Sequence, residues 1–163
     1  MADYQDGNSE GVVKMSSKRE QLDLVLGSGV IAIVRASSSA ELINVADAIK
    51  QGGVNVIEIT MTTPDALEVI RDVSRKLAGE VLAGAGSVLD PETARAAILA
   101  GAEFIVSPTL SVETIALCNR YGKLVVPGAF TPTEILTAWE AGADLVKVFP
   151  ASLGGPEYIR AIK

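Results

Sequence analysis

The sequence contains no histidine, one cysteine and few aromatic residues, and each shortage removes a class of function. Without histidine, Ser-His-Asp and Cys-His nucleophiles are excluded, together with His-based proton transfer and nearly all zinc or non-haem iron sites. A single cysteine allows neither an internal disulfide nor a thiolate metal cluster. Magnesium held by carboxylates alone is still allowed, but no tight acidic cluster suggests it. We therefore expect no metal and no cofactor, and a chemistry based on lysine, carboxylate and hydroxyl groups.

Long apolar runs and basic runs are also missing. The longest apolar stretches, such as residues 30–34, fall far short of the ~20 residues that a membrane-spanning helix needs. The acidic, polar N-terminus is unlike a signal peptide. A net charge of -6 without any Lys/Arg-rich run argues against a nonspecific nucleic-acid surface. We expect a cytoplasmic protein that binds neither membranes nor nucleic acid.

What the sequence does contain describes one α/β domain with an aliphatic core. The 163 residues are 48% hydrophobic and include 15 glycines. Short apolar runs recur at intervals of roughly 20 to 26 residues, and a helical pattern fills each gap. These runs begin near Val30, Val56, Val81, Phe104, Leu124 and Leu145. Such alternation predicts parallel β/α units, which build either barrels or doubly wound sheets.

The length of the chain sets how many of these units are present. Residues 1–17 are predicted to be a flexible tail, and the first helix is expected to begin near Ser17. Six strands can be counted, and a further helix begins at Gly155. A closed barrel usually takes about 200 residues or more. We therefore expect residues 18–163 to form an incomplete TIM-barrel domain, C-terminally truncated to about six βα units. Strands seven and eight would be absent, and the first and sixth strands would keep unpaired edges.

Lys147 interrupts the apolar segment of residues 145–150, where an unpaired ammonium ion is costly to bury. Strand side chains alternate, so Lys147 is expected to share one face with Leu145 and Phe149, opposite Val146 and Val148. A buried lysine commonly avoids the cost through a lowered pKa, which leaves an amine that forms Schiff bases with carbonyls. The alternative is a lysine that extends its amine to solvent from the end of a strand.

Glu58 is a second charged residue inside an apolar strand, between Ile57 and Ile59. Alternation places it on the same face as Thr60. A purely structural explanation is a buried ion pair with Lys147 that neutralises the interior. Because such pairs are poor stabilisers, a functional role for the carboxylate is favoured.

Further polar residues fall at the ends of the apolar runs, where a βα barrel places its chemistry. Arg35 follows the first run. The third run ends in Gly84-Ala85-Gly86-Ser87, whose backbone can approach a ligand closely, although it lacks the third glycine of a dinucleotide fingerprint. The fourth ends in Ser107-Pro108-Thr109 and the fifth begins a loop at Pro127-Gly128. These two segments serve either as rim loops or as ordinary turns.

Two other residues are expected to have packing roles. Cys118 lies in an apolar helical context and is interpreted as a small buried hydrophobe. Trp139 is predicted to pack within a helical layer rather than to bind a ligand. Neither residue is therefore assigned to a site.

Taken together, these segments resemble the KDPG/KHG aldolases, the 2-keto-3-deoxy-6-phosphogluconate and 4-hydroxy-2-oxoglutarate aldolases, which are class I enzymes on a (β/α)8 barrel. The resemblance runs in order from about Leu24 to Lys163. The motifs that carry it are Ile33-Val34-Arg35, Ile57-Glu58-Ile59-Thr60, Gly84-Ala85-Gly86-Ser87, Ile105-Val106-Ser107-Pro108, Pro127-Gly128 with Thr131-Pro132-Thr133-Glu134, and Val146-Lys147-Val148-Phe149-Pro150-Ala151.

The resemblance implies roles for individual residues. Lys147 would form the Schiff base with the keto carbon, and Glu58 would transfer protons in carbinolamine formation and in C–C cleavage. Ser87 stands where the family usually has a threonine that holds the pyruvoyl carboxylate. Thr62 stands where some members have an arginine for the substrate carboxylate, and Arg35 is the candidate replacement for that cation. The substrate-binding set that the resemblance implies is Arg35, Thr62, Ser87, Pro108 and Phe149.

The resemblance also implies an activity and its partners. A 2-keto-3-deoxy-6-phospho sugar acid, or 4-hydroxy-2-oxoglutarate, would be cleaved to pyruvate and an aldehyde without a metal or cofactor. The small keto acid would be the ligand, and a homotrimer is the assembly that the family suggests. Phosphate-binding loops would lie beyond Lys163. Two alternatives stay open: a noncatalytic, truncated barrel remnant, and the related phosphogalactonate aldolase.

Overall fold

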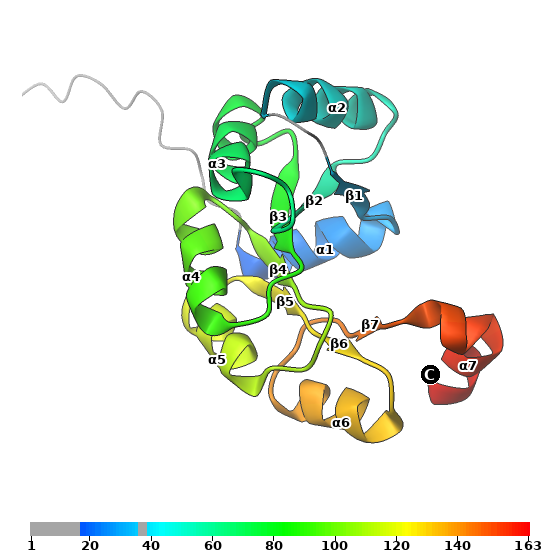
Figure 1. The fold of residues 1–163 in the computed structure, drawn as a ribbon. Helices are drawn as coiled ribbons and strands as arrows, with labels where there is room; N and C mark the ends of the chain where they lie inside the picture. The colour runs from blue at the N-terminus through cyan, green and yellow to red at the C-terminus, as the bar shows by residue number, and fades with distance from the viewer. Residues whose placement is uncertain (1–16, 36–38) are drawn as a thin grey trace, which may run out of the picture.

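The computed structural model describes residues 17–35 and 39–163, in which helices cover the outer side of a curved parallel sheet (Figure 1). The tail expected over residues 1–17 lies outside the described residues except for Ser17. That serine caps the first helix.

Helices and strands alternate along the chain, as the apolar periodicity predicts. The helices are α1 Lys18–Ser28, α2 Ser39–Gln51, α3 Ala66–Lys76, α4 Pro91–Ala100, α5 Val112–Arg120, α6 Pro132–Glu140 and α7 Gly155–Ile162. The strands are β1 Ala32–Val34, β2 Val56–Thr60, β3 Leu82–Gly86, β4 Phe104–Val106, β5 Leu124–Val126, β6 Gly128–Ala129 and β7 Lys147–Val148. A short 3₁₀ turn, η1 Ala151–Leu153, precedes α7.

The strands are parallel and follow one another in chain order. The first five form a sheet in the order β1-β2-β3-β4-β5, and β6 pairs with β7. Only Pro127 separates β5 from β6, and its carbonyl oxygen accepts a hydrogen bond of 2.9 Å from the Lys147 backbone N–H. The ladder therefore continues from β5 through β6 to β7. Sequential order without a reversal, with helices outside, is barrel topology rather than that of a doubly wound sheet.

Four of the helix N-termini carry a side-chain cap. Ser17, Asp90, Ser111 and Thr131 each accept a hydrogen bond from a backbone N–H in the first turn of the helix that follows. Glu20 completes a capping box with Ser17. Asp65 differs, because its backbone is left-handed (φ 52°) and its side chain makes no capping bond. The helix that follows, α3, therefore begins at Ala66 without a side-chain cap.

Alternation along the strands divides the buried side chains into two layers. The outer layer lies between sheet and helices, and it includes Ile57, Ile59, Ala85 and Ile105. The inner layer fills the concave side of the sheet, where the apolar residues of β2 to β5 meet α1; it consists of Val25, Val56, Leu82, Phe104, Val106, Leu124 and Val126. Side chains on the concave side therefore share one apolar base, from which the polar ends of the strands emerge.

The structure corrects several expectations of detail. The first strand begins at Ala32 rather than Val30, because Gly29 ends α1 in a left-handed turn (φ 65°) and the chain needs further residues to enter the sheet. The sixth strand is reduced to Lys147–Val148, which has a partner on one side, the equally short β6. Trp139 does not pack within the helical layer, since it is 62% exposed. Cys118 is fully buried as predicted, and burial raises the pKa of its thiol to about 12.

Candidate active site

Glu58 lies in the middle of β2 and is only 4% exposed. Its carboxylate rests against Gly86 on the neighbouring strand, where an ideal Cβ would lie 1.8 Å from Glu58 Oε1. Any side chain at position 86 would occupy the space that the carboxylate now fills. The turn noted in the sequence for its small residues therefore makes room for a protein side chain at this position.

Gly84 leaves space for the aromatic ring of Phe104 in the same way. Glu58 pairs with Gly84 in the register of β2 and β3, and Gly84 pairs with Phe104 in that of β3 and β4. A Cβ at Gly84 would lie 2.4 Å from the Phe104 ring, which is fully buried. On the concave face of β3, the two glycines therefore leave the positions after Leu82 without side chains, and the Glu58 carboxylate lies there beside the apolar inner layer.

The electrostatic state of Glu58 follows from this position. Burial raises the pKa of its carboxyl above the ordinary value of 4.5, and the positive charges of Lys147 and Arg35 act in the opposite direction. Both cations are therefore close enough to act on Glu58. Among the described residues, however, none of the ion pairs includes Glu58. The interior ion pair with Lys147, offered as the structural explanation, does not form.

Lys147 enters the site from β7. Its Cα pairs with that of Gly128, and its Nζ lies 4.9 Å from the centroid of the Phe149 ring. Leu145 packs against the inner layer and Val146 against the outer one, which confirms the predicted alternation and puts Lys147 on the concave side. Lys147 is half-buried rather than fully buried, since the described strands give β7 a neighbour on one side only. The ring of Phe149 partly shields the amine, with Phe149 itself 43% exposed.

The remaining predicted residues lie at the carboxyl ends of their strands. Arg35 follows β1 and is exposed. Ser87 directly follows Gly86 at the end of β3, with a left-handed backbone (φ 59°) that is unusual for a residue with a side chain. Pro108 follows β4. Its carbonyl group lies 2.3 Å from the position that a Cβ on Gly128 would take. Because Gly128 is the register partner of Lys147, Pro108 belongs to the same rim.

Thr62 belongs to a hydroxyl cluster that the sequence did not reveal. The Thr60 hydroxyl lies 3.0 Å from that of Thr62 and 3.4 Å from that of Thr63. Thr60 and Thr63 are buried, whereas Thr62 is exposed at the rim. Alternation had put Thr60 on the same face as Glu58, and that was the available signal for this cluster.

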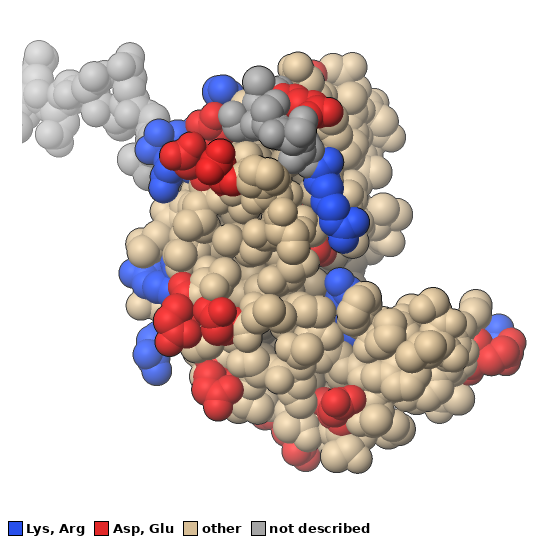
Figure 2. Space-filling model, viewed as in Figure 1, with Lys and Arg blue, Asp and Glu red and all other residues tan. Residues whose placement is uncertain are grey.

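The site opens into a hollow between the sheet and α7, and blue Lys and Arg atoms mark its wall in Figure 2. The overall charge of the chain is nevertheless negative. Positive charge gathered in a concave region of an acidic protein favours a small anion at that place. The carboxylate of a keto acid is an anion of this kind.

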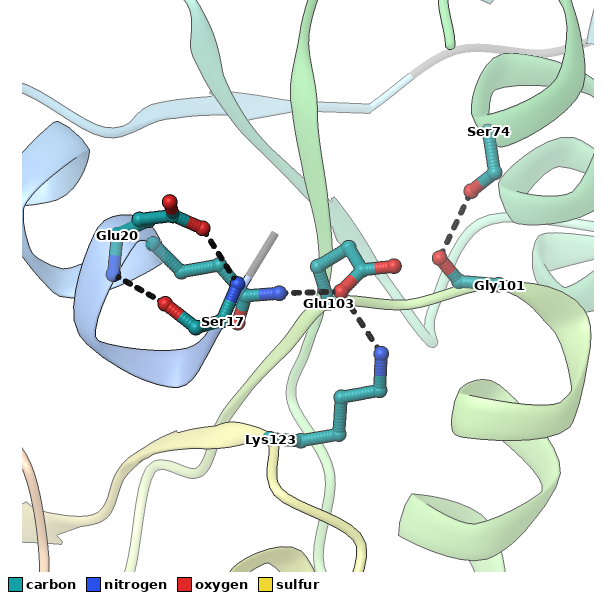
Figure 3. Close-up of polar contacts among 7 residues, drawn as sticks. Ser17, Glu20, Ser74, Gly101, Glu103 and Lys123 are labelled. Carbon is teal, nitrogen blue, oxygen red and sulfur yellow. Dashed lines mark hydrogen bonds and ion pairs between the residues drawn. The ribbon is translucent and has the colours of Figure 1, made fainter. Parts of the chain in front are cut away.

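A second, buried lysine lies at the opposite end of the sheet, away from this hollow (Figure 3). Lys123, with a side chain 7% exposed, forms an ion pair of 2.7 Å with Glu103, and the Gln21 amide of α1 donates to the same carboxylate. Lys18 of α1 pairs with Asp144 at 2.9 Å. These contacts attach α1 across the amino ends of the strands. Burial of a lysine does not by itself define a site. Lys123 forms an ion pair with its neighbouring carboxylate, whereas Lys147 lies near the Glu58 carboxylate without forming one among the described residues.

Metal sites and membrane-spanning helices are both absent from the described residues. Within residues 17–35 and 39–163, no group of three or more Cys, Asp or Glu side chains is arranged to hold a metal ion. In the same segments, every helix is too short or too polar to cross a membrane.

The fold and the charged residues together define a class: a (β/α)-barrel protein with a lysine and a buried glutamate at the carboxyl half of its parallel strands. The family model described as KDPG and KHG aldolase matches residues 23–163. The chain belongs to this aldolase family, as the motifs indicated.

Individual relatives agree with this assignment. The 2-dehydro-3-deoxy-6-phosphogalactonate aldolase of Escherichia coli K12 is 37% identical over 134 residues, which are 82% of this chain and 65% of that protein. The 2-dehydro-3-deoxy-phosphogluconate aldolase of Treponema pallidum is 38% identical over 134 residues, 82% of this chain and 63% of that protein. The chain thus spans slightly less than two thirds of the length of these curated relatives.

A solved structure extends the comparison to the fold. The KDPG aldolase of Legionella pneumophila, with pyruvate captured as a covalent carbinolamine intermediate, matches with a TM-score of 0.80 and 27% identity. The match covers 86% of this chain and 68% of that one. The likeness confirms the barrel topology predicted from the sequence.

Proposed function

We propose that this chain is a class I aldolase in which Lys147 forms a Schiff base with a 2-keto acid and Glu58 transfers the protons. Its substrate would be a 2-keto-3-deoxy-6-phospho sugar acid, 4-hydroxy-2-oxoglutarate or both, and its products pyruvate and an aldehyde. The observation that carries the proposal is the state of Glu58. It is buried beside Gly86, within the field of Lys147 and Arg35, and it is ion-paired with neither.

An unpaired, buried carboxyl suits a group that must both give and take protons. The raised pKa brings its protonated and ionised forms closer to balance near neutral pH than in an exposed glutamate. An ion pair with Lys147 would have fixed the glutamate as an anion and the lysine as a cation, which cannot attack a carbonyl. The absence of that pair among the described residues leaves both groups available for chemistry.

The steps follow from these two groups. The neutral Lys147 amine adds to the C2 carbonyl, and Glu58 protonates the carbinolamine hydroxyl, which leaves as water and gives an iminium ion. Glu58 then removes the proton of the C4 hydroxyl, the C3–C4 bond breaks, and its electron pair moves to the iminium to form an enamine. The aldehyde leaves. The proton returns from Glu58 to C3, and hydrolysis releases pyruvate and the free amine.

The substrate carboxylate is assigned to the rim. Arg35 supplies the cation, because Thr62 has a neutral hydroxyl where some relatives have arginine. Ser87 adds a hydroxyl and a backbone N–H at the end of β3. It directly follows Gly86, the residue against which the Glu58 carboxylate rests. The Phe149 ring provides an apolar surface beside the Lys147 amine, and Pro108 contributes to the rim next to Gly128, the register partner of Lys147.

Pyruvate release distinguishes the possible substrates. The 163-residue chain is incubated in parallel with 2-keto-3-deoxy-6-phosphogluconate, its galactonate epimer and 4-hydroxy-2-oxoglutarate, and pyruvate is followed by a coupled dehydrogenase. The phosphogalactonate substrate is a serious second candidate because that aldolase is as similar to the chain as the phosphogluconate enzyme is. Release above that of Lys147→Met from any of the three supports the proposal. Equal release by both proteins contradicts it.

A noncatalytic barrel remnant is the alternative from another class. It would associate through the open edges of β1 and β7. Size-exclusion chromatography with light scattering separates the two, since a discrete species such as the homotrimer suggested by the family supports an enzyme. Heterogeneous aggregates without pyruvate release would support the remnant.

A further inference from the structure

The stretch that follows Lys147 is held by an aromatic pair. Two backbone hydrogen bonds join the ends of the last strands, from Lys147 N–H to the Pro127 carbonyl at 2.9 Å and from Phe149 N–H to the Ala129 carbonyl at 3.0 Å. Phe130 is the next residue on one strand. On the other, the chain turns through η1 into α7, which has Tyr158 in its first half.

Tyr158 returns to Phe130 and contacts it twice. The two rings are stacked, with centroids 4.9 Å apart and planes inclined by 20°. The Tyr158 hydroxyl also donates a hydrogen bond to the Phe130 carbonyl. Stacked aromatic pairs and buried hydrogen bonds both stabilise such contacts.

Each partner is itself fixed. The Phe130 N–H donates to Glu134 Oε2 at 3.0 Å, a carboxylate that also accepts from the N–H and hydroxyl of Thr131. Phe130 is therefore anchored to the N-terminus of α6. Tyr158 packs on Gly154, where a Cβ would lie 2.6 Å from the tyrosine Cβ. The tyrosine side chain thus connects the turn before α7 to the end of β6.

Little else holds α7. No residue of this helix is buried, and its ion pair between Arg160 and Glu157 lies within the helix itself. Among the described residues, α7 is joined to other elements by one hydrogen bond and one ring contact, both between Tyr158 and Phe130, and by no ion pair. Apolar side chains of α6 and α7 do face one another across an open groove of about 420 Å³.

We propose that Phe130 and Tyr158 form a latch that positions the Lys147 amine for Schiff-base formation. The latch lies at the ends of β6 and β7. It therefore holds in place both Phe149, whose ring shields the Lys147 amine, and the turn that follows Phe149. Tyr158 is a positioning residue and not a catalytic one. The inference rests on the proposed function, since the Schiff base is what the latch serves.

The test compares Tyr158→Phe, which keeps the stacked ring, with Tyr158→Ala, which loses both contacts. Tyr121→Ala is the matched control, because Tyr121 is a half-exposed tyrosine that contacts Arg95 away from the site. The rate of pyruvate trapping by borohydride is measured across pyruvate concentration and pH. We expect Tyr158→Ala to lower the maximal rate by on the order of tenfold, with a smaller change in half-saturating pyruvate. Tyr158→Phe should recover most of the rate, and Tyr121→Ala should leave it unchanged.

Two outcomes overturn the latch. If Tyr158→Ala traps pyruvate at the rate of the unchanged chain, or if only the half-saturating concentration rises, the pair does not position the amine. Hydrogen exchange at the amides of Lys147 and Phe149 provides a reading that needs no catalysis. Faster exchange in Tyr158→Ala alone supports the latch, and unchanged exchange contradicts it. Failure of the unchanged chain to trap pyruvate would instead contradict the proposed function.

Discussion

The carboxylate of Glu58 occupies the space that a side chain at Gly86 would need, with 1.8 Å between Glu58 Oε1 and an ideal Cβ at that position. Gly86→Ala should therefore displace the glutamate from its place on β3. Forcing an atom into a filled interior costs about 1 to 3 kcal/mol in the free energy of unfolding. We also expect a loss of pyruvate release on the order of tenfold or more, because the group proposed to transfer protons moves.

Gly27→Ala is the control for this substitution. Gly27 lies in α1 and has no atom within 4 Å of the added methyl group, so the change is expected to be neutral or slightly stabilising. Urea unfolding and pyruvate release are measured on both variants. Normal activity in Gly86→Ala would show that the position of the Glu58 carboxylate is not required.

Glu58→Gln should change how stability depends on pH. Because the folded-state pKa of Glu58 is raised, its favourable contribution is present below the ordinary value of 4.5 and is lost as pH rises through the folded pKa. Above that point the ionised carboxylate is buried at a cost, and a neutral glutamine avoids it. We therefore expect the variant to gain stability over the unchanged chain from about pH 5 upward, with little difference near about pH 4.

Urea unfolding across this range measures the difference. Glu157→Gln serves as the control, since its side chain is 83% exposed and removing the charge should shift stability little at any pH. A constant difference between Glu58→Gln and the unchanged chain over the whole range would contradict the assignment of a raised pKa.

Much of the fold could be predicted because buried parallel strands give continuous apolar runs. The same property pointed to the site, because Glu58 and Lys147 stand out as charges within such runs. Alternation predicted that Leu145 and Val146 face opposite sides, and they pack against different layers. The start of the first helix at Ser17 followed from capping chemistry, which is local.

Features that depend on contacts between distant residues could not be predicted. The fit of Glu58 to Gly86 requires the register of β2 against β3, which one sequence does not give. The exposure of Lys147 depends on which strands flank β7, and the pattern suggested a deeper position than the structure shows. Phe130 and Tyr158 are far apart in the chain, and neither belongs to an apolar run that marks it.

Lys123 gives a prediction about the other end of the sheet. Lys123→Met leaves the Glu103 carboxylate without its cation, and the Glu103 side chain is only partly exposed. Removing one partner of a buried pair is destabilising, and partial exposure of Glu103 reduces the expected cost to about 1 to 3 kcal/mol. Adding Glu103→Gln should recover part of that loss.

Arg160→Met is the matched surface change, since the pair with Glu157 is 72% and 83% exposed and should contribute less than about 0.5 kcal/mol. Urea unfolding of all these variants gives the comparison. Equal effects at the two sites would mean that the Lys123 pair does not help to hold α1 in place.

The central claim is that Lys147 forms a Schiff base, and reduction with borohydride in the presence of pyruvate tests it most directly. The account predicts a stable mass increase on the peptide that contains Lys147, absent from Lys147→Met and slower to form in Glu58→Gln. Lys123, which is buried and paired with Glu103, should stay unmodified. A folded chain without any adduct, or with the adduct on another lysine, would contradict the account.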